Sequence, residues 1–188
     1  MESTSREEDV IGYQAREDWM GVEVLTLADV FPPEPRAVIV GLNPAPASVV
    51  AGHYYQGRVG QRQLRKLADA GLFALPDGEP HFEAAALRSG VGFTDIVKRA
   101  SVGEGDVAAA EITHGRSILE DKLAGLRVPL VVCVFRHPMV ALLGREGSPG
   151  MQRDRTSWGA QVFRMPGPFE ARESSDRVMA ELISLLQA

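Results

Sequence analysis

The fold is decided by one stretch of the sequence, Ala37-Val38-Ile39-Val40-Gly41-Leu42-Asn43-Pro44-Ala45-Pro46. Its first four residues are apolar and three of them are β-branched, which is typical of a strand buried on both faces of a parallel sheet. Gly41 ends this run, and the two prolines then force the chain into a fixed, irregular path. The stretch therefore predicts a central strand followed by a shaped loop, with the Asn43 carboxamide over the edge of the sheet.

Strand and helix patterns alternate along the rest of the chain. Strands are predicted over 90–97, 129–135 and 161–165, and helices over 60–70, 107–126, 139–143 and 175–186. Residues 26–31 precede the proline-rich segment 32–35 and are interpreted as a short amphipathic turn. Such alternation favours an α/β sandwich around a mostly parallel sheet.

Ligands of such sheets bind outside the carboxyl ends of the strands. We therefore expect the functional site among three loops, which are residues 41–60, the segment after Val97 and the segment after Met165. The acidic residues 1–18 are expected to form a solvated, partly disordered tail, and residues 19–188 a single domain.

The charge of the chain is unevenly distributed. The net charge is −5, which by itself argues against a nucleic-acid binder because phosphate contacts need Lys and Arg. Nine acidic and two basic residues lie within 1–35, which leaves eighteen basic and sixteen acidic residues for 36–188. Basic residues gather in two places, at Arg58, Arg62, Arg65 and Lys66, and at Arg153, Arg155 and Arg172. The chain reads as a modestly basic domain behind an acidic segment, which is compatible with DNA binding.

Several classes of protein are disfavoured by the sequence. The single cysteine, Cys133, lies in an apolar run, so no intramolecular disulfide can form and a reducing cytoplasm is expected. No run approaches the ~18 apolar residues of a membrane span. His53, His81, His114, His137 and Cys133 have no metal-ligand spacing, and no nucleotide-binding fingerprint is present. We expect a monomer with no metal and no cofactor.

Residues 26–48, which include Gly-Leu-Asn-Pro-Ala at 41–45, resemble the opening of the mismatch-specific uracil/thymine-DNA glycosylases. These enzymes are a branch of the uracil-DNA glycosylase superfamily, and their first motif reads Gly-Ile-Asn-Pro-Gly. The resemblance continues at 52–55, at 90–99 and at Trp158-Gly159, and so covers most of residues 26–188 in order.

This resemblance implies a three-layer α/β/α sandwich with a short parallel sheet. It also implies base excision repair, by slow, monofunctional hydrolysis of the N-glycosidic bond of a uracil, a mispaired thymine or a related deaminated base that is flipped out of DNA. Asn43 matches the asparagine that positions water, and Tyr55 the aromatic that stacks on the base. The implied base pocket is formed by Gly41, Leu42, Pro44, Gly52, His53 and Tyr55. From the residues alone, simple packing of Tyr54 and Tyr55, or a surface or capping role for His53, stays open.

The second motif of this branch, Asn-Pro-Ser-Gly-Leu, corresponds to Met-Pro-Gly-Pro-Phe-Glu-Ala-Arg at 165–172. Gly167 replaces the asparagine, and Phe169 or Arg172 would act as the wedge that fills the space of the flipped base. The DNA-binding residues implied are Arg58, Arg62, Gly167, Pro168, Phe169 and Arg172.

The altered second motif keeps two alternatives open. One is a catalytically weak or silent relative that binds damaged or single-stranded nucleic acid. The other is an α/β enzyme that acts on a free nucleoside.

His137-Pro138 follows a predicted strand and is similar to the His-Pro-Ser motif of other branches of the superfamily. Because a further strand and helix follow it, we interpret His137 as a helix-capping or turn residue rather than a catalytic one.

Overall fold

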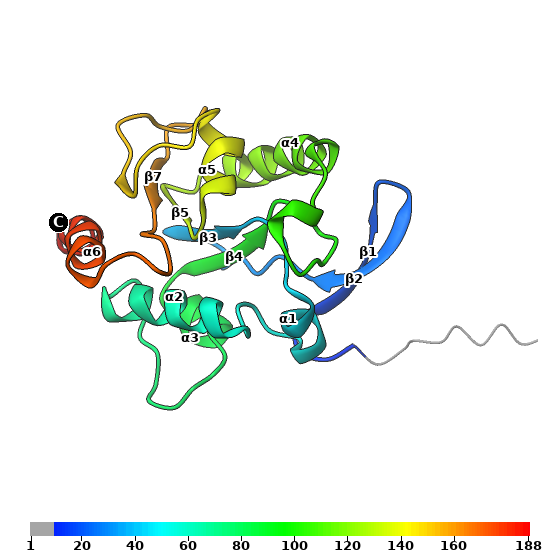
Figure 1. The fold of residues 1–188 in the computed structure, drawn as a ribbon, viewed down its shortest axis with the longest axis horizontal. Coiled ribbons are helices and arrows are strands. Elements are labelled where there is room, and N and C mark those ends of the chain that lie inside the picture. Colours follow the sequence, from blue (N-terminus) through cyan, green and yellow to red (C-terminus); the bar gives the residue numbers. More distant parts are fainter. Residues whose placement is uncertain (1–9) are drawn as a thin grey trace, which may run out of the picture.

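The computed structural model describes residues 10–188, and its centre is a five-stranded sheet in the order β4-β3-β5-β7-β6 (Figure 1). The strands are β3 (Ala37–Gly41), β4 (Val91–Asp95), β5 (Leu130–Cys133), β6 (Gly150–Met151) and β7 (Gln161–Arg164). Strands β3, β4, β5 and β7 run parallel to one another, and in this sheet only the two-residue β6 runs antiparallel to its neighbour, β7. The short, mostly parallel sheet predicted from the sequence is confirmed.

Helices cover both faces of this sheet, as Figure 1 shows. One face packs against α1 (Pro46–Ala51), α2 (Arg58–Asp69), α3 (Glu83–Arg88) and α6 (Arg172–Gln187), and the other against α4 (Ala109–Gly125) and α5 (Arg136–Leu143). Successive side chains of β3 point to opposite faces of the sheet, so each face has its own hydrophobic core. Ile39 lies in the core under α1, α2, α3 and α6, and Val38 and Val40 lie in the core under α4 and α5. The three-layer α/β/α sandwich is confirmed.

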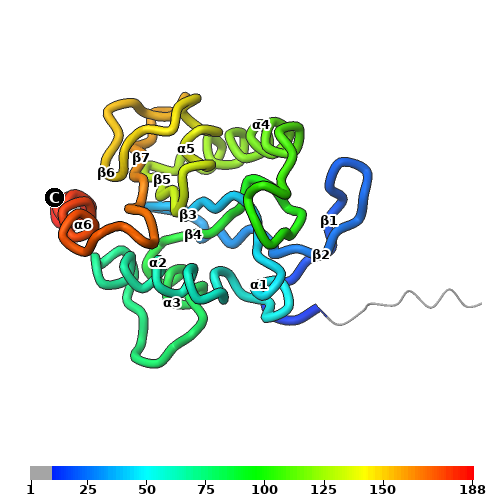
Figure 2. The backbone as a smooth tube through the Cα atoms, in the orientation of Figure 1, coloured from blue at the N-terminus to red at the C-terminus, as the bar shows by residue number. Residues whose placement is uncertain are grey.

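A β-hairpin precedes the sheet and corrects two expectations. β1 (Gln14–Trp19) pairs antiparallel with β2 (Val22–Leu27), so residues 14–18 are strand rather than tail, and residues 26–27 end a strand rather than begin a turn. The acidic residues suggested a tail, but a two-stranded ribbon can also carry them, because one of its faces is free for charged side chains. Figure 2 shows this hairpin at the margin of the molecule. Of the rest of the expected tail, residues 10–13 contain no helix or strand, and residues 1–9 lie outside the described residues.

The hairpin is fastened to α4 by a buried polar network. Trp19 Nε1 donates to Glu111 Oε1 over 3.1 Å, and the Arg99 guanidinium donates to both oxygens of the same carboxylate over 2.8 and 2.7 Å. The hydrogen bonds from Arg99 outweigh desolvation and lower the pKa of Glu111 to about 2. The network fixes the chain directly after β4, where the strand leads into the candidate site.

Three further features concern the classes of protein that the sequence disfavours. The Cys133 thiol is buried at the end of β5, and this burial raises its pKa. Within residues 10–188 no group of three metal-ligating side chains comes together. No helix in the same range is long and apolar enough to cross a membrane.

Gly115 provides a test of the packing between α4 and the chain after β4. A Cβ at this position would overlap the Ile96 carbonyl and lie 3.0 Å from the Trp19 ring, whereas a Cβ at Gly125 in the same helix would meet nothing within 4 Å. We expect Gly115→Ala to destabilise the protein by about 1–3 kcal/mol through overpacking. Gly125→Ala should be neutral or stabilise it by up to about 1 kcal/mol. Chemical denaturation of both variants checks this, and equal stabilities would contradict the packing described.

Candidate active site

A cavity of about 450 Å³ opens at the carboxyl ends of β3, β4 and β5. Its wall is built from residues 41–45, Tyr54 and Tyr55, the start of α2, Asp95, the loop 101–104, and Phe135 with His137. Two of the three loops expected at the site therefore contribute to it. The third, after Met165, is not part of the wall.

Asn43 is held in one orientation by two hydrogen bonds. Its Nδ2 donates to the Arg99 carbonyl over 2.9 Å and to Ser101 Oγ over 2.7 Å. These partners use both donors of the amide, and no described residue donates to Oδ1. The residue lines the cavity, so its carbonyl oxygen is the atom left to accept a hydrogen bond from a molecule inside.

Gly41, Tyr55 and Asp95 meet at the floor of the cavity. The parallel register places Gly41 opposite Asp95, at the ends of β3 and β4. A Cβ on Gly41 would overlap Asp95 Oδ1 and lie 2.9 Å from the Tyr55 hydroxyl, so both polar groups converge on the space that glycine leaves. The Tyr55 hydroxyl is buried without a hydrogen-bond partner, and no described residue hydrogen-bonds the Asp95 carboxyl. Two unpartnered polar groups at one point indicate a place for the polar atoms of a ligand.

The environment of Asp95 changes its acidity. The residue is only 6% exposed, and desolvation, with a smaller contribution from Asp29, outweighs the attraction of Lys98 and raises the pKa of Asp95 to about 7. A carboxyl with such a pKa exists both as a donor and as an acceptor near neutral pH. Strongly shifted groups in a cleft are candidates for functional residues. The sequence reasoning missed Asp95, although a polar residue that ends a buried strand beside Gly41 was a usable signal.

Tyr55 has an unfavourable backbone conformation. Its φ is +56°, which costs a residue with a side chain of order 1 kcal/mol or more. The first turn of α2 packs closely on it, since a Cβ at Gly60 would lie 3.0 Å from Tyr55 Cα and Cβ. Its neighbour Tyr54 is buried in the core, and its hydroxyl donates to the Ala28 carbonyl over 3.0 Å. Both tyrosines thus line the cavity, but of the two hydroxyls only that of Tyr54 has a hydrogen-bond partner among the described residues.

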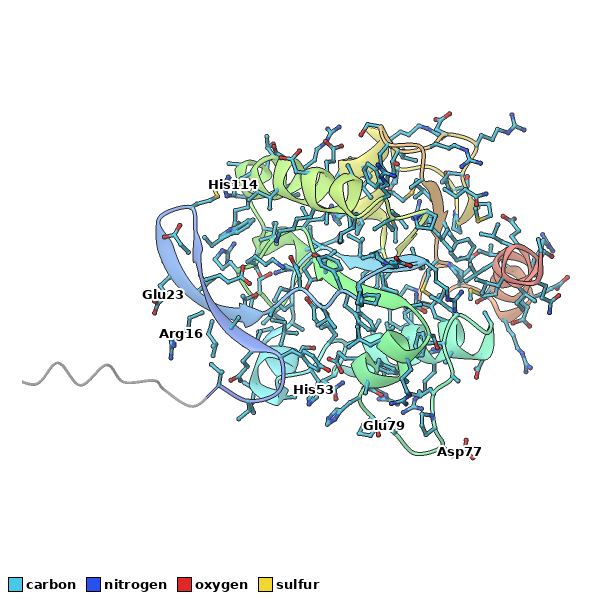
Figure 3. All side chains as sticks on the ribbon, turned by 180° about the vertical axis from the view of Figure 1, so that it is seen from behind. Arg16, Glu23, His53, Asp77, Glu79 and His114 are labelled. Carbon is cyan, nitrogen blue, oxygen red and sulfur yellow. The ribbon has the colours of Figure 1, made fainter. Side chains whose placement is uncertain are left out.

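Gly52 and His53, expected in the pocket, lie outside it. Gly52 ends α1 with φ +72°, and its close contact with the Ile11 carbonyl is structural. The His53 ring points toward α3, where Nδ1 lies 3.1 Å from Glu83 Oε2 and the ring stacks on His81 at 3.5 Å. Figure 3 labels His53 and Glu79 on the side covered by α1 and α3, away from His114 on α4. The buried Glu83 carboxylate turns His53 away from the cavity.

His137 lines the cavity and hydrogen-bonds the short turn 104–106, so of the two roles expected for it the bond at a turn is present and helix capping is not. Its Nε2 is 2.8 Å from Glu104 Oε2, and the N-cap residue of α5 is Phe135, which makes no side-chain capping bond. Phe135 itself adds an aromatic side chain to the wall. Sequence reasoning missed it, although an aromatic directly after a buried parallel strand carries the same positional signal as Asn43 after β3.

The family model of the uracil DNA glycosylase superfamily matches residues 28–180. The chain belongs to the uracil-DNA glycosylase superfamily. This match covers every residue that lines the cavity except Leu27, together with the whole five-stranded sheet, and members of the superfamily are DNA glycosylases.

In this superfamily member, α2 connects the cavity with the loop after β7. Arg58 lines the cavity and Arg62 follows it one turn later on an exposed face, while Gln63 Nε2 donates to the Pro166 carbonyl over 2.9 Å. The expected DNA-binding residues therefore divide into two groups. Arg58 is at the cavity, and the others are outside its wall: Arg62, Gly167, Pro168, Phe169 and Arg172.

The unpartnered hydroxyl of Tyr55 can be tested against that of Tyr54. Tyr55→Phe removes a buried polar group that lacks a partner, so we expect the free energy of unfolding to stay equal or to rise by about 1 kcal/mol. Tyr54→Phe removes the bond to Ala28 and should lower it by about 1 kcal/mol or more. Denaturation of the two variants in parallel measures the difference. A loss of stability in Tyr55→Phe as large as in Tyr54→Phe would show that the hydroxyl is bonded within the protein.

Proposed function

We propose that the protein is a DNA glycosylase that removes a uracil, a mispaired thymine or a related deaminated base from DNA, as a member of the mismatch-specific branch. Membership of the superfamily supports the class of reaction. The single observation that carries the proposal is the orientation of Asn43, whose bound Nδ2 leaves Oδ1 as an acceptor in a cavity that also holds Asp95 and the Tyr55 hydroxyl.

The dimensions of the cavity fit one base. A volume of about 450 Å³ lies at the lower end of the roughly 300–1,000 Å³ of small-molecule sites. A base inside a duplex cannot reach the floor of such a pocket, so it has to be rotated out of the stack. Unstacking costs least for a mispaired or damaged base, and this difference favours such bases. Phe135 provides an aromatic side chain in the wall for stacking, whereas Tyr55 presents its hydroxyl beside Asp95.

The chemistry follows from the groups in the wall. A water bound to Asn43 Oδ1 attacks C1′ of the sugar while the bond from C1′ to the base nitrogen breaks, and the base leaves with the electron pair. The proton that the added water loses ends on the nitrogen of the released base. An amide is too weak a base to take the proton of this water early, so Asn43 contributes by positioning. The sugar passes through an oxocarbenium-like state, and negative charge develops on the base. The Tyr55 hydroxyl and the protonated Asp95 donate to the base oxygens and stabilise that charge.

Contacts with the DNA strand are assigned to the exposed groups around the pocket. Phe169 is 84% exposed in the loop after β7, which suits a side chain that enters the base stack, and the Arg172 side chain beside it is 95% exposed. Arg58 and Arg62 present guanidinium groups on α2 for the phosphates. These assignments rest on exposure and charge.

The central experiment is base release in a single turnover. We expect the wild-type protein to release uracil, or thymine from a G·T pair, from labelled oligonucleotides offered both as duplexes and as single strands. Asn43→Ala removes the acceptor for water and should lower the rate by about 100-fold or more, in line with the loss of one positioned catalytic group. DNA binding by the variant should change little.

A matched control is Gln56→Ala, which removes another carboxamide close to the pocket. Gln56 Nε2 donates to the Tyr54 and Pro80 carbonyls, and the residue is not in the wall, so its rate should stay within a few-fold of wild type. Tight, salt-dependent binding without release of any tested base would instead support the silent binder. Turnover of a free nucleoside without a polynucleotide would support the small-molecule alternative.

The raised pKa of Asp95 predicts how the rate of base release depends on pH. Its pKa is raised to about 7, so the carboxyl is a donor below that pH and an ionised acceptor above it. Release of uracil, whose oxygens accept hydrogen bonds, should therefore fall as pH rises through about 7. Asp95→Asn keeps a donor at every pH, so its rate should be nearly flat across this range. Single-turnover rates of both proteins across pH measure this, and an unchanged profile in Asp95→Asn would exclude Asp95 as the titrating group.

A further inference from the structure

Glu104, Arg136 and His137 form an ion-pair cluster at the rim of the cavity, outside the groups used so far. Glu104 begins the short 3-10 turn η1 (Glu104–Asp106), and the two basic residues open α5. Arg136 Nη2 donates to Glu104 Oε1 over 2.9 Å, and His137 Nε2 lies 2.8 Å from Glu104 Oε2. Both oxygens of one carboxylate are thus held by side chains of a different element.

We propose that Arg136 and His137 form a binding site for a phosphodiester of the DNA strand, and that the Glu104 carboxylate occupies this site until DNA displaces it. This inference rests on the proposed action on DNA. A carboxylate and a phosphodiester each present two anionic oxygens to such a pair, and guanidinium groups bind both. The carboxylate bound here is therefore a stand-in from the protein's own chain.

The surroundings of the pair favour an anion at this place. The first turn of α5 contains no acidic residue, and its N-cap side chain makes no capping bond. The partial positive charge of this helix end adds to the charge of the side chains. Within residues 10–188, one other carboxylate pairs with Arg136, that of Glu146, which accepts from Nη1 over 3.2 Å and leaves Nη2 facing Glu104. A phosphate can replace Glu104 without removing Glu146.

The Glu104 carboxylate lies where a phosphate of DNA can replace it. The side chain of Glu104 is 53% exposed and that of Arg136 is 49% exposed, and ion pairs at such exposed positions stabilise a protein only weakly. Desolvation raises the pKa of Glu104, but the combined interactions with His137 and Arg136 outweigh it and hold the pKa below its usual range, so the carboxylate stays charged. By contrast, Arg99 is bound to the largely buried Glu111 and to the Asp106 carbonyl, and it is not offered to DNA.

The short loop 101–104 connects Glu104 with the side-chain amide of Asn43. Ser101 Oγ accepts from Asn43 Nδ2 and donates to the Gly103 carbonyl, and Glu104 follows directly. Only two residues, Val102 and Gly103, separate the serine whose hydroxyl orients Asn43 from the glutamate held by Arg136. Displacement of Glu104 by a phosphate therefore moves the loop 101–104, whose Ser101 hydroxyl orients Asn43. A bound DNA strand in this way affects the residue that positions water.

The test is a double-mutant cycle on DNA affinity, measured by fluorescence anisotropy with a duplex that carries an abasic-site analogue. Glu104→Gln removes the competing charge and should tighten binding about two- to fivefold. Arg136→Gln removes the phosphate ligand, so it should weaken binding about tenfold and reduce the salt slope by about one. In the Arg136→Gln background, Glu104→Gln should have a much smaller effect, because only His137 remains for the phosphate and Glu104 to compete for.

The control is Asp154→Asn, which removes one exposed, ion-paired carboxylate that pairs with Arg145 instead. We expect it to tighten binding far less than Glu104→Gln does. Equal tightening by the two variants, or the same effect of Glu104→Gln with and without Arg136, would mean that only overall charge matters and would overturn the inference. If the wild type releases bases and the cycle shows no coupling, the inference alone fails. Absence of DNA binding by every variant overturns the proposed function as well.

Discussion

The close packing of Gly41 against Asp95 and the Tyr55 hydroxyl is the constraint on which the pocket depends. The parallel register of β3 and β4 brings the last residues of both strands opposite each other, and only glycine leaves room there for two polar side chains. Any Cβ at this point would fill the floor of the cavity. The strand that organises the sheet thus also sets the depth and polarity of the site.

Several features of the site cost stability. Tyr55 adopts a positive φ, its hydroxyl is buried without a partner, and the Asp95 carboxyl is desolvated. Each costs of order 1 kcal/mol or more. The two cores that flank the sheet offset these costs, since each buried branched side chain of β3 contributes roughly 1.5–3 kcal/mol. Strain and unpaired groups gathered at one cavity are typical of a functional site.

The sequence predicted the layers of the fold and part of the site, and the reasons differ by residue. The run 37–41 is apolar on both faces, so the buried parallel strand followed from composition, and Asn43 followed from its place after that strand. The hairpin 14–27 was missed because its charged residues hide a ribbon fastened by Trp19. His53 was misplaced because a single buried carboxylate, Glu83, turns its ring away. Asp95 was missed although its place at the end of a buried strand was a usable signal, whereas His137 reaches the cavity through a contact with a distant loop, which no local pattern encodes.

The account is tested most directly by the structure of the protein with DNA that carries an uncleavable 2′-fluoro analogue of deoxyuridine. We expect the uracil ring inside the cavity, with its oxygens within hydrogen-bond distance of the Tyr55 hydroxyl and the Asp95 carboxyl, and a water between Asn43 Oδ1 and C1′. A base that stays stacked in the duplex, or that binds outside the space above Gly41, would contradict it.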